Sequence, residues 1–165
     1  MIDTYAKSFG LGLIIGIRSL VGPALLSRKL VRTVPVKEPQ RPVHYFIQPP
    51  VATGLAVLAA TEILTDKLSG TPDRTVPFQF VGRIVSGGSC GAVLSEVEGQ
   101  SVLAGSIAGG VGAAVGTIAT FHLRQWLTHG VGLPDPVVAL AEDMLCVGAG
   151  WAIVNSIEPV RQPAH

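Results

Sequence analysis

Charged residues are scarce in this sequence. Lysine, arginine, aspartate and glutamate make up 14% of the 165 residues, whereas hydrophobic residues make up 48%. A soluble domain carries roughly 25% charged residues, so this chain has too few to cover a water-facing surface in the usual way. A buried core helix of a soluble protein would explain one apolar run, but not several. The composition therefore favours a protein whose solvent is lipid.

A strong net charge is also lacking. The formal net charge is +1, and aromatic residues make up only 5% of the chain. A nucleic-acid-binding surface needs basic residues gathered on one face or along one helix, and the basic residues here form no such stripe beside aromatic ones. Nucleic acid is therefore not expected among the partners.

Cysteine is limited to Cys90 and Cys146, both within apolar runs. A small disulfide-stabilised fold uses more cysteines, and a zinc site uses ligand pairs at short spacing. Both cysteines are expected to be small buried hydrophobic residues. The sequence leaves any metal or cofactor unassigned.

Five apolar segments are long enough, or nearly so, to cross a hydrocarbon layer of about 30 Å as helices. They cover about residues 8–30, 51–68, 78–95, 101–121 and 137–157, and a basic, proline-bearing loop follows the first at 28–48. No small-residue cleavage site interrupts the first segment, which is therefore expected to be a retained span. The predicted fold class is an all-α, polytopic membrane helix bundle, with one membrane domain over 1–165.

Two of these segments contain features that oppose a straight helix. The first holds Gly22-Pro23, and proline removes a backbone donor and clashes with the preceding turn. An interruption is predicted there, either a simple kink or the broken helix of a transporter, whose half-helix ends bind ions or charged substrates. The third holds Arg83 and the glycine-rich "SGGSCGAV". For that segment, an irregular or partly re-entrant course is the alternative to a regular helix.

The fourth segment has a face made of small residues. Gly105 and Gly109 lie four residues apart, as do Gly112 and Gly116. Such a face lets helix backbones approach closely, which is how helices associate in lipid. We expect a close contact along this face, either with another helix of the chain or across the interface of a homo-oligomer or larger membrane complex.

The orientation is predicted from the basic loop. Its lysines and arginines outnumber those of the other loops, and basic loops stay on the cytoplasmic side. With five spans, the N-terminus is expected outside and the C-terminus in the cytoplasm.

Ionisable residues within the predicted spans gather in one half of the membrane. A charge at the bilayer centre costs at least about 2.5–3.5 kcal/mol, so each is expected either to pair in an ion pair that holds helices in register or to serve a substrate or ion site. Arg18, near the middle of the first span, lies deepest in the predicted membrane. At the opposite ends of spans two to five, the only such residues are Glu96 and Glu98. The set comprises Arg18, Glu62, Asp66, Arg83, Arg124, Glu142 and Asp143.

Several stretches together resemble a family of small bacterial membrane proteins catalogued as domain of unknown function 4126. They are "GIRSLVGPALL", "TEILTDKL" followed by "TPDRT", "GRIVSGGSCGAVL" and "GLPDPVVALAED". Their order covers most of the chain, from about Gly12 to Ile157. The resemblance implies a multi-pass inner-membrane protein and brings no established activity.

The leading hypothesis is a small transporter or permeation unit. In it, Arg18 and Arg83 bind an anionic group, while Glu62, Asp66 and Glu142 take protons or a cation. A second hypothesis is a membrane enzyme acting on a lipid or lipid-linked phosphate, in which carboxylates such as Asp66 and Asp143 hold a divalent metal ion. A third is a structural or accessory subunit of a larger membrane complex.

Overall fold

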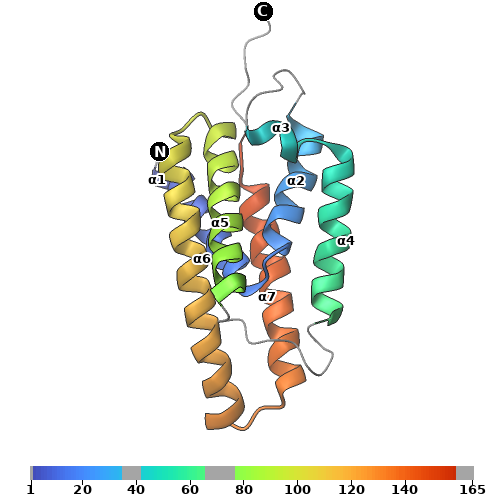
Figure 1. Ribbon diagram of the computed structural model, residues 1–165, viewed down its shortest axis with the longest axis vertical. Coiled ribbons are helices and arrows are strands. Elements are labelled where there is room, and N and C mark those ends of the chain that lie inside the picture. Colours follow the sequence, from blue (N-terminus) through green and yellow to red (C-terminus); the bar gives the residue numbers. More distant parts are fainter. Residues whose placement is uncertain (1, 35–41, 66–76, 159–165) are drawn as a thin grey trace, which may run out of the picture.

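The protein is built from helices that lie side by side (Figure 1). The computed structural model describes residues 2–34, 42–65 and 77–158, and no strand occurs in these ranges. The all-α prediction is confirmed. The elements are α1 (Ile2–Ile17), α2 (Val21–Thr33), α3 (Pro42–Phe46), α4 (Pro49–Thr65), α5 (Pro77–Val97), α6 (Val102–Gln125), the π-helical segment η1 (Trp126–Gly130) and α7 (Asp135–Asn155).

Two stretches of helix are long and apolar enough, by length and composition, to cross a membrane. They are Val102–Gly130, which joins α6 to η1, and Asp135–Asn155, which is α7. The apolar helix at Pro49–Leu64 is shorter. Of the five predicted spans, two therefore correspond to described helices that are long and apolar enough to cross a membrane.

The first predicted span, 8–30, is two helices that fold back on each other. A side-chain carbon added at Gly22, in α2, would meet the side chains of Ile15 and Leu11, in α1. One added at Gly150, in α7, would meet the side chains of both Leu25 and Ile14. Thus α2 runs back alongside α1 instead of continuing it, as the blue and light-blue ribbons show (Figure 1). The predicted span 8–30 is therefore not one helix running the length of the bundle, because the chain returns to the end of the bundle from which it started.

The break between the two helices lies at Arg18–Leu20, just before the predicted Gly22-Pro23. Pro23 is in the first turn of α2, where backbone N–H groups have no partner within the helix. Its missing N–H therefore removes no hydrogen bond, while its ring would clash with the carbonyl group four residues earlier, at Ser19. The proline thus ends the preceding helix upstream of itself.

The third predicted span is a regular helix, α5, so an irregular or re-entrant course there is wrong. Its glycines serve close packing rather than a bend. A side-chain carbon added at Gly87 or Gly91 would collide with the backbone of α6 at Gly109 or Gly105. The segment that turns back within the bundle is instead the pair α1–α2.

The predicted small-residue face of α6 is used within the chain. Gly105 and Gly109 pack against α5, while Gly112 and Gly116 pack against the backbone of α1. All four glycines are buried. An oligomer through this helix, which stays a prediction, would have to use its outward side instead.

The two ends of the described chain lie at the same end of the bundle (Figure 1). Glu98, in the turn between α5 and α6, accepts hydrogen bonds from Lys7 Nζ at 3.0 Å and from the backbone N–H of Glu158 at 3.2 Å. The predicted topology has the termini on opposite sides and differs from this arrangement, because α1–α2 turns back instead of running the length of the bundle. The predicted basic loop 28–48 is also partly helical: it includes the end of α2 and all of α3.

Apolar side chains face outward on the long helices, and charged side chains face inward. Arg18, Arg83, Glu142 and Asp143 are each at most 7% exposed. Among the Asp, Glu, Lys and Arg side chains described on α4 to α7, only Asp135, at the start of α7, is exposed. Exposed apolar side chains include Val57 and Leu58 on α4, Val81 and Val85 on α5, Ile107, Val111 and Ile118 on α6, and Leu140, Met144 and Leu145 on α7.

Candidate functional site at the hairpin tip

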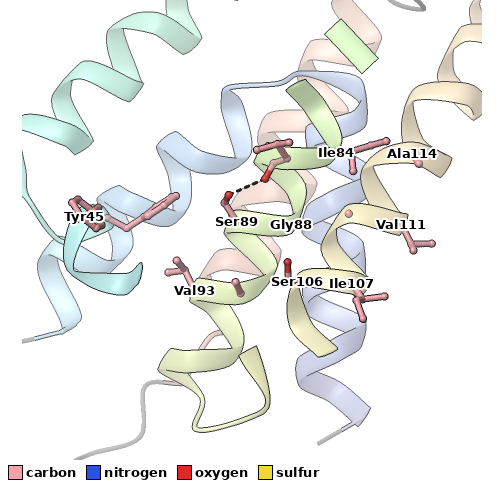
Figure 2. A pocket seen from close by; sticks show the side chains of 13 residues that line it. Tyr45, Ile84, Gly88, Ser89, Val93, Ser106, Ile107, Val111 and Ala114 are labelled. Atoms are coloured by element: carbon pink, nitrogen blue, oxygen red, sulfur yellow. Dashed lines mark hydrogen bonds between the residues drawn. The ribbon is translucent and has the colours of Figure 1, made fainter. Parts of the chain in front are cut away.

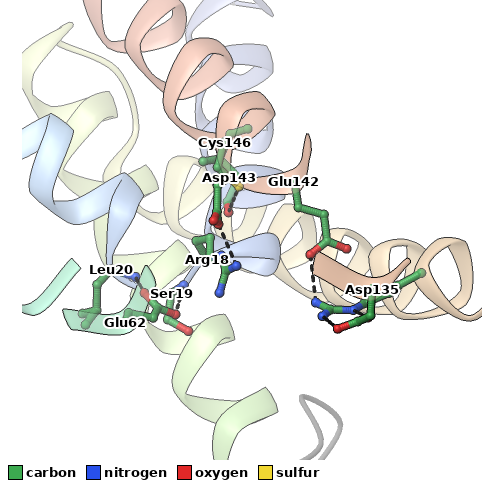
Figure 3. Close-up of polar contacts among 10 residues, drawn as sticks. Arg18, Ser19, Leu20, Glu62, Asp135, Glu142, Asp143 and Cys146 are labelled. Atoms are coloured by element: carbon green, nitrogen blue, oxygen red, sulfur yellow. Dashed lines mark hydrogen bonds and ion pairs between the residues drawn. The ribbon is translucent and has the colours of Figure 1, made fainter. Parts of the chain in front are cut away.

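The three residues that join α1 to α2, Arg18–Leu20, are here called the hairpin tip. Arg18 is 2% exposed, and its Nη2 atom lies 2.6 Å from Oδ1 of Asp143 on α7. Figure 3 shows the two side chains pointing toward each other inside the bundle. The deepest charge predicted from the sequence thus forms an ion pair with a charge near the other end of the chain.

The N-terminal end of α2 is capped by a side chain from another helix. The two carboxylate oxygens of Glu62, on α4, accept hydrogen bonds from the backbone N–H groups of Ser19 and Leu20, each at 2.9 Å (Figure 3). The N-terminal end of a helix carries partial positive charge and free N–H groups, so it attracts a carboxylate. Glu62 therefore satisfies the backbone that the break leaves open.

The C-terminal end of α1 has the complementary arrangement. The carbonyl oxygen of Gly16 accepts a hydrogen bond from Nη1 of Arg83 at 2.6 Å and another from the hydroxyl of Thr117 at 3.2 Å. A cation is favourable at a helix C-terminus for the same electrostatic reason. In addition, the hydroxyl of Ser86 donates to the carbonyl oxygen of Ser19 at 3.2 Å. Each half-helix end at the tip is thus held by a charge of the opposite sign.

A second charged group links α6 to α7 near the tip. The guanidinium of Arg124 donates to both carboxylate oxygens of Asp135, at 2.9 and 2.8 Å, and to Oε2 of Glu142 at 3.2 Å. Glu142 and Asp143 are adjacent in sequence, so they point in different directions from α7. They accordingly contact different cations, Arg124 and Arg18 (Figure 3).

The structure brings together most of the residues predicted for the site. Arg18, Glu62, Arg83 and Asp143 meet at the hairpin tip, and Glu142 lies beside them on α7. Asp66 lies outside the described residues. Sequence reasoning missed the hydroxyl groups of Thr117 and Ser86 and the backbone of Ser19 and Leu20, since nothing in a sequence marks a backbone group as exposed at a helix break.

The described residues hold no cluster suited to a metal ion. No group of three or more His, Cys, Asp or Glu side chains gathers among residues 2–34, 42–65 and 77–158. Glu62, Glu142 and Asp143 instead contact backbone amides and two different arginines. In the described part of the chain, no observation favours the hypothesis of a carboxylate-bound divalent ion.

The opposite end of the bundle carries a smaller ionic group. Lys7, which precedes the first predicted span, lies 2.6 Å from Asp3 and 3.0 Å from Glu98. Burial alone would lower the pKa of Lys7, but the hydrogen bonds and charges of Asp3 and Glu98 outweigh it and raise the pKa above 10.5. Glu96, also at this end, accepts a hydrogen bond from the backbone N–H of Val43 at 3.2 Å. This group joins helix ends at the surface of the bundle.

A separate groove runs along the outside of α5 and α6, next to α3. Its volume is about 960 Å³, and Figure 2 shows Gly88 and Ser106 between flanking side chains such as Ile107 and Val111. Among the described residues, no Asp, Glu, Lys or Arg lines it. The hydroxyl of Ser89, at its edge, donates to the carbonyl oxygen of Val85 in its own helix. The groove belongs to the apolar exterior and is distinct from the polar hairpin tip.

Compared with known proteins, the chain matches no family model, no curated protein and no solved structure. Its resemblance to the family of domain of unknown function 4126 therefore stays a prediction. The function has to be inferred from the residues and their arrangement.

Proposed function

We propose that the protein is an integral protein of the bacterial inner membrane. The support is the distribution of side chains, apolar outside and charged inside, which suits a bundle surrounded by lipid. Exposed aromatic residues occur toward both ends of the bundle, as at a membrane's two interfaces. Phe78 and Trp126 lie at one end, and Tyr45 and Trp151 lie toward the other.

In this proposal, α4, α5, α6 and α7 cross the membrane and α1–α2 enters it and returns. Both ends of the described chain then lie on the same side as Arg28, Lys29 and Arg32 of α2, which is the cytoplasmic side by the distribution of positive charge. The C-terminus keeps the location predicted from the sequence, whereas the N-terminus moves to the cytoplasmic side.

We further propose that the protein is a small transporter or permeation unit, and that the hairpin tip is where a small charged solute passes or binds. One observation carries this proposal: a broken helix pair ends inside the bundle, with charged side chains from α4, α5 and α7 around its two half-helix ends. Non-helical backbone at membrane depth is tolerated only inside protein or beside a water-filled cavity. Transporters use such half-helix ends to bind ions and charged substrates.

The residues at the tip divide into two roles in this proposal. Arg18, Arg83 and the N-terminal end of α2 attract an anionic group, and the carboxylate of Glu62 already occupies that end of the helix. Glu62, Glu142 and Asp66, the last outside the described residues, carry protons or a cation. The proposed transport is therefore that of a small anion, coupled to protons or to a cation.

Flux measurements in liposomes test the proposal. The purified protein is reconstituted with a pH-sensitive dye or a chloride-sensitive dye inside, and gradients of chloride, nitrate, phosphate and protons are applied in turn. We expect the wild-type protein to carry at least one of these ions. Arg18→Ala and Glu62→Gln should reduce that flux by about tenfold or more, the scale on which removing an electrostatic partner at a site acts.

The matched control is Gly148→Ala, on α7, because a side-chain carbon at Gly148 would meet no atom within 4 Å. This variant should carry ions as the wild type does. Equal flux in the wild type, Arg18→Ala and Glu62→Gln across the whole panel would argue against transport at the tip.

The second candidate function is that of a structural or accessory subunit. It is favoured by the contacts of the buried arginines, since Arg18, Arg83 and Arg124 each contact an acceptor within the chain. Such contacts can hold helices in register without binding any solute. Gentle solubilisation followed by size measurement separates the two candidates. A protein that runs alone or as a homo-oligomer fits a transporter, whereas constant co-purification with a fixed partner fits a subunit.

A further inference from the structure

Among the longer helices of the bundle, α4 has the fewest buried residues. It packs against α2 and touches α3, at the edge of the molecule (Figure 1). Among its described side chains, only Ala59 is buried. By contrast, α6 has eight buried residues and meets α1 and α5 through backbone contacts at glycine. Little apolar surface therefore holds α4 in place.

The strongest described attachment of α4 is polar. Glu62 reaches the backbone N–H groups of Ser19 and Leu20 at the hairpin tip. Hydrogen bonds to a charged group are stronger than those between neutral groups, and a helix N-terminus adds a favourable field. Glu62 is thus the charged contact that ties α4 to the hairpin tip, beside the packing of α4 on α2.

The apolar cluster to which α4 contributes Ala59 also contains a cysteine. Cys146, on α7, is fully buried in an apolar cluster that contains Ala59 of α4, together with Val21 and Ala24 of α2. Cys90, on α5, is also fully buried, but in a different cluster, with Leu11, Val93 and Ala113 and without any residue of α4. The two cysteines therefore report on different parts of the bundle.

We propose that α4 is a lid over the hairpin tip and that Glu62 is its latch. When the carboxylate leaves the amides of Ser19 and Leu20, α4 tilts away from α2, and the two amides and Cys146 become reachable from outside the bundle. The core of α1, α5 and α6 stays closed. The proposed transport function determines what would then enter, but the lid itself does not depend on it.

Alkylation of the two native cysteines tests the lid. Cys90→Ala and Cys146→Ala each leave one cysteine, and the rate of its reaction with N-ethylmaleimide is measured in mild detergent. In the Glu62→Gln background we expect Cys146 to react about tenfold faster or more, while the rate at Cys90 is unchanged. A tenfold rise in the open fraction corresponds to about 1.4 kcal/mol.

A second pair of variants leaves the latch intact. Ala59→Leu adds bulk at the one buried position of α4 and should also speed the reaction of Cys146, because overpacking forces neighbours apart. Ala60→Leu makes the same change at the adjacent, exposed position and should have no effect.

Two outcomes would overturn the lid. Unchanged alkylation of Cys146 in both Glu62→Gln and Ala59→Leu would mean that α4 does not open. Equal acceleration at Cys146 and Cys90 would mean that the whole bundle loosens. Since alkylation needs no transported ion, an absence of flux would count against the proposed function without bearing on the lid.

Discussion

Arg18 and Asp143 show what a charge requires in the interior of this bundle. The pair is almost completely buried, so neither charge has water to stabilise it. Removing one member leaves the other without compensation, which typically costs about 3–5 kcal/mol, whereas replacing both by apolar residues is often close to neutral. Each of the two charges is therefore stable in the interior only beside the other, and the pair is also the centre of the proposed site.

We predict that Arg18→Met and Asp143→Leu each lower the free energy of unfolding by roughly 3–5 kcal/mol. The double variant should lose clearly less than the sum of the two, because no buried charge of this pair remains uncompensated. Denaturant unfolding in detergent micelles, followed by circular dichroism, measures these values. Strictly additive losses would show that the two residues do not act as a pair.

Some glycines are required for close helix packing, and others are not. A methyl group at Gly109 would collide with the carbonyl group of Gly87 across the contact between α5 and α6. At Gly54, on α4, a methyl group would meet no atom within 4 Å.

We predict that Gly109→Ala destabilises the protein by about 1–3 kcal/mol, because the helices must move apart. Gly54→Ala should leave stability unchanged or raise it by up to about 1 kcal/mol, since alanine favours a helix. Thermal unfolding of the two variants beside the wild type makes the comparison. A Gly109→Ala variant as stable as Gly54→Ala would contradict the close contact.

Among the helices, the pair α1–α2 is where sequence and structure differ most. The gathering of Arg18, Glu62, Arg83 and Asp143 could be predicted, because alternating helices fix the depth of each residue. The reversal at Arg18–Leu20 could not, since a run of apolar residues has the same length whether it crosses a membrane or turns back inside it. Pro23 signalled a break, but its effect falls on the residues before it.

The same ambiguity applies to the glycine-rich helices. The motif "SGGSCGAV" in α5 is compatible with an irregular segment or with a regular helix in close contact, and only the partner decides between them. The partner is α6, whose own small-residue face was recognised in the sequence. The sequence thus showed that each of the two helices is rich in glycine. It did not show that the two helices pack against each other.

For the whole molecule, the hairpin changes how the two ends of the chain relate. An N-terminal segment that turns back on itself, followed by four helices that alternate in direction, brings Lys7, Glu98 and the N–H of Glu158 together. Arg28, Lys29 and Arg32, toward the C-terminal end of α2, lie at that same end. The bundle therefore has one end that holds both termini and another where α6 and α7 are joined.

We predict that reporters fused to the N-terminus and to the C-terminus lie on the same, cytoplasmic side of the membrane. A fluorescent protein that folds only in the cytoplasm and a phosphatase active only in the periplasm, each fused at either end, provide the measurement. A reporter inserted at Gly132, between η1 and α7, serves as the control and should lie on the other side. Termini on opposite sides would restore the crossing predicted for residues 8–30.

The hairpin also has a consequence for the order in which the protein is made. α1 and α2 are made before the other described helices, and the groups that cover their tip follow one by one: the hydroxyl of Thr117 contacts the carbonyl of Gly16 across 101 residues, and Asp143 follows later still. Until Asp143 exists, the tip presents an arginine without its ion-pair partner, which lipid would not accept. In the proposed membrane topology, the N-terminal hairpin therefore waits outside the hydrocarbon layer during synthesis and enters as the final helices close around it.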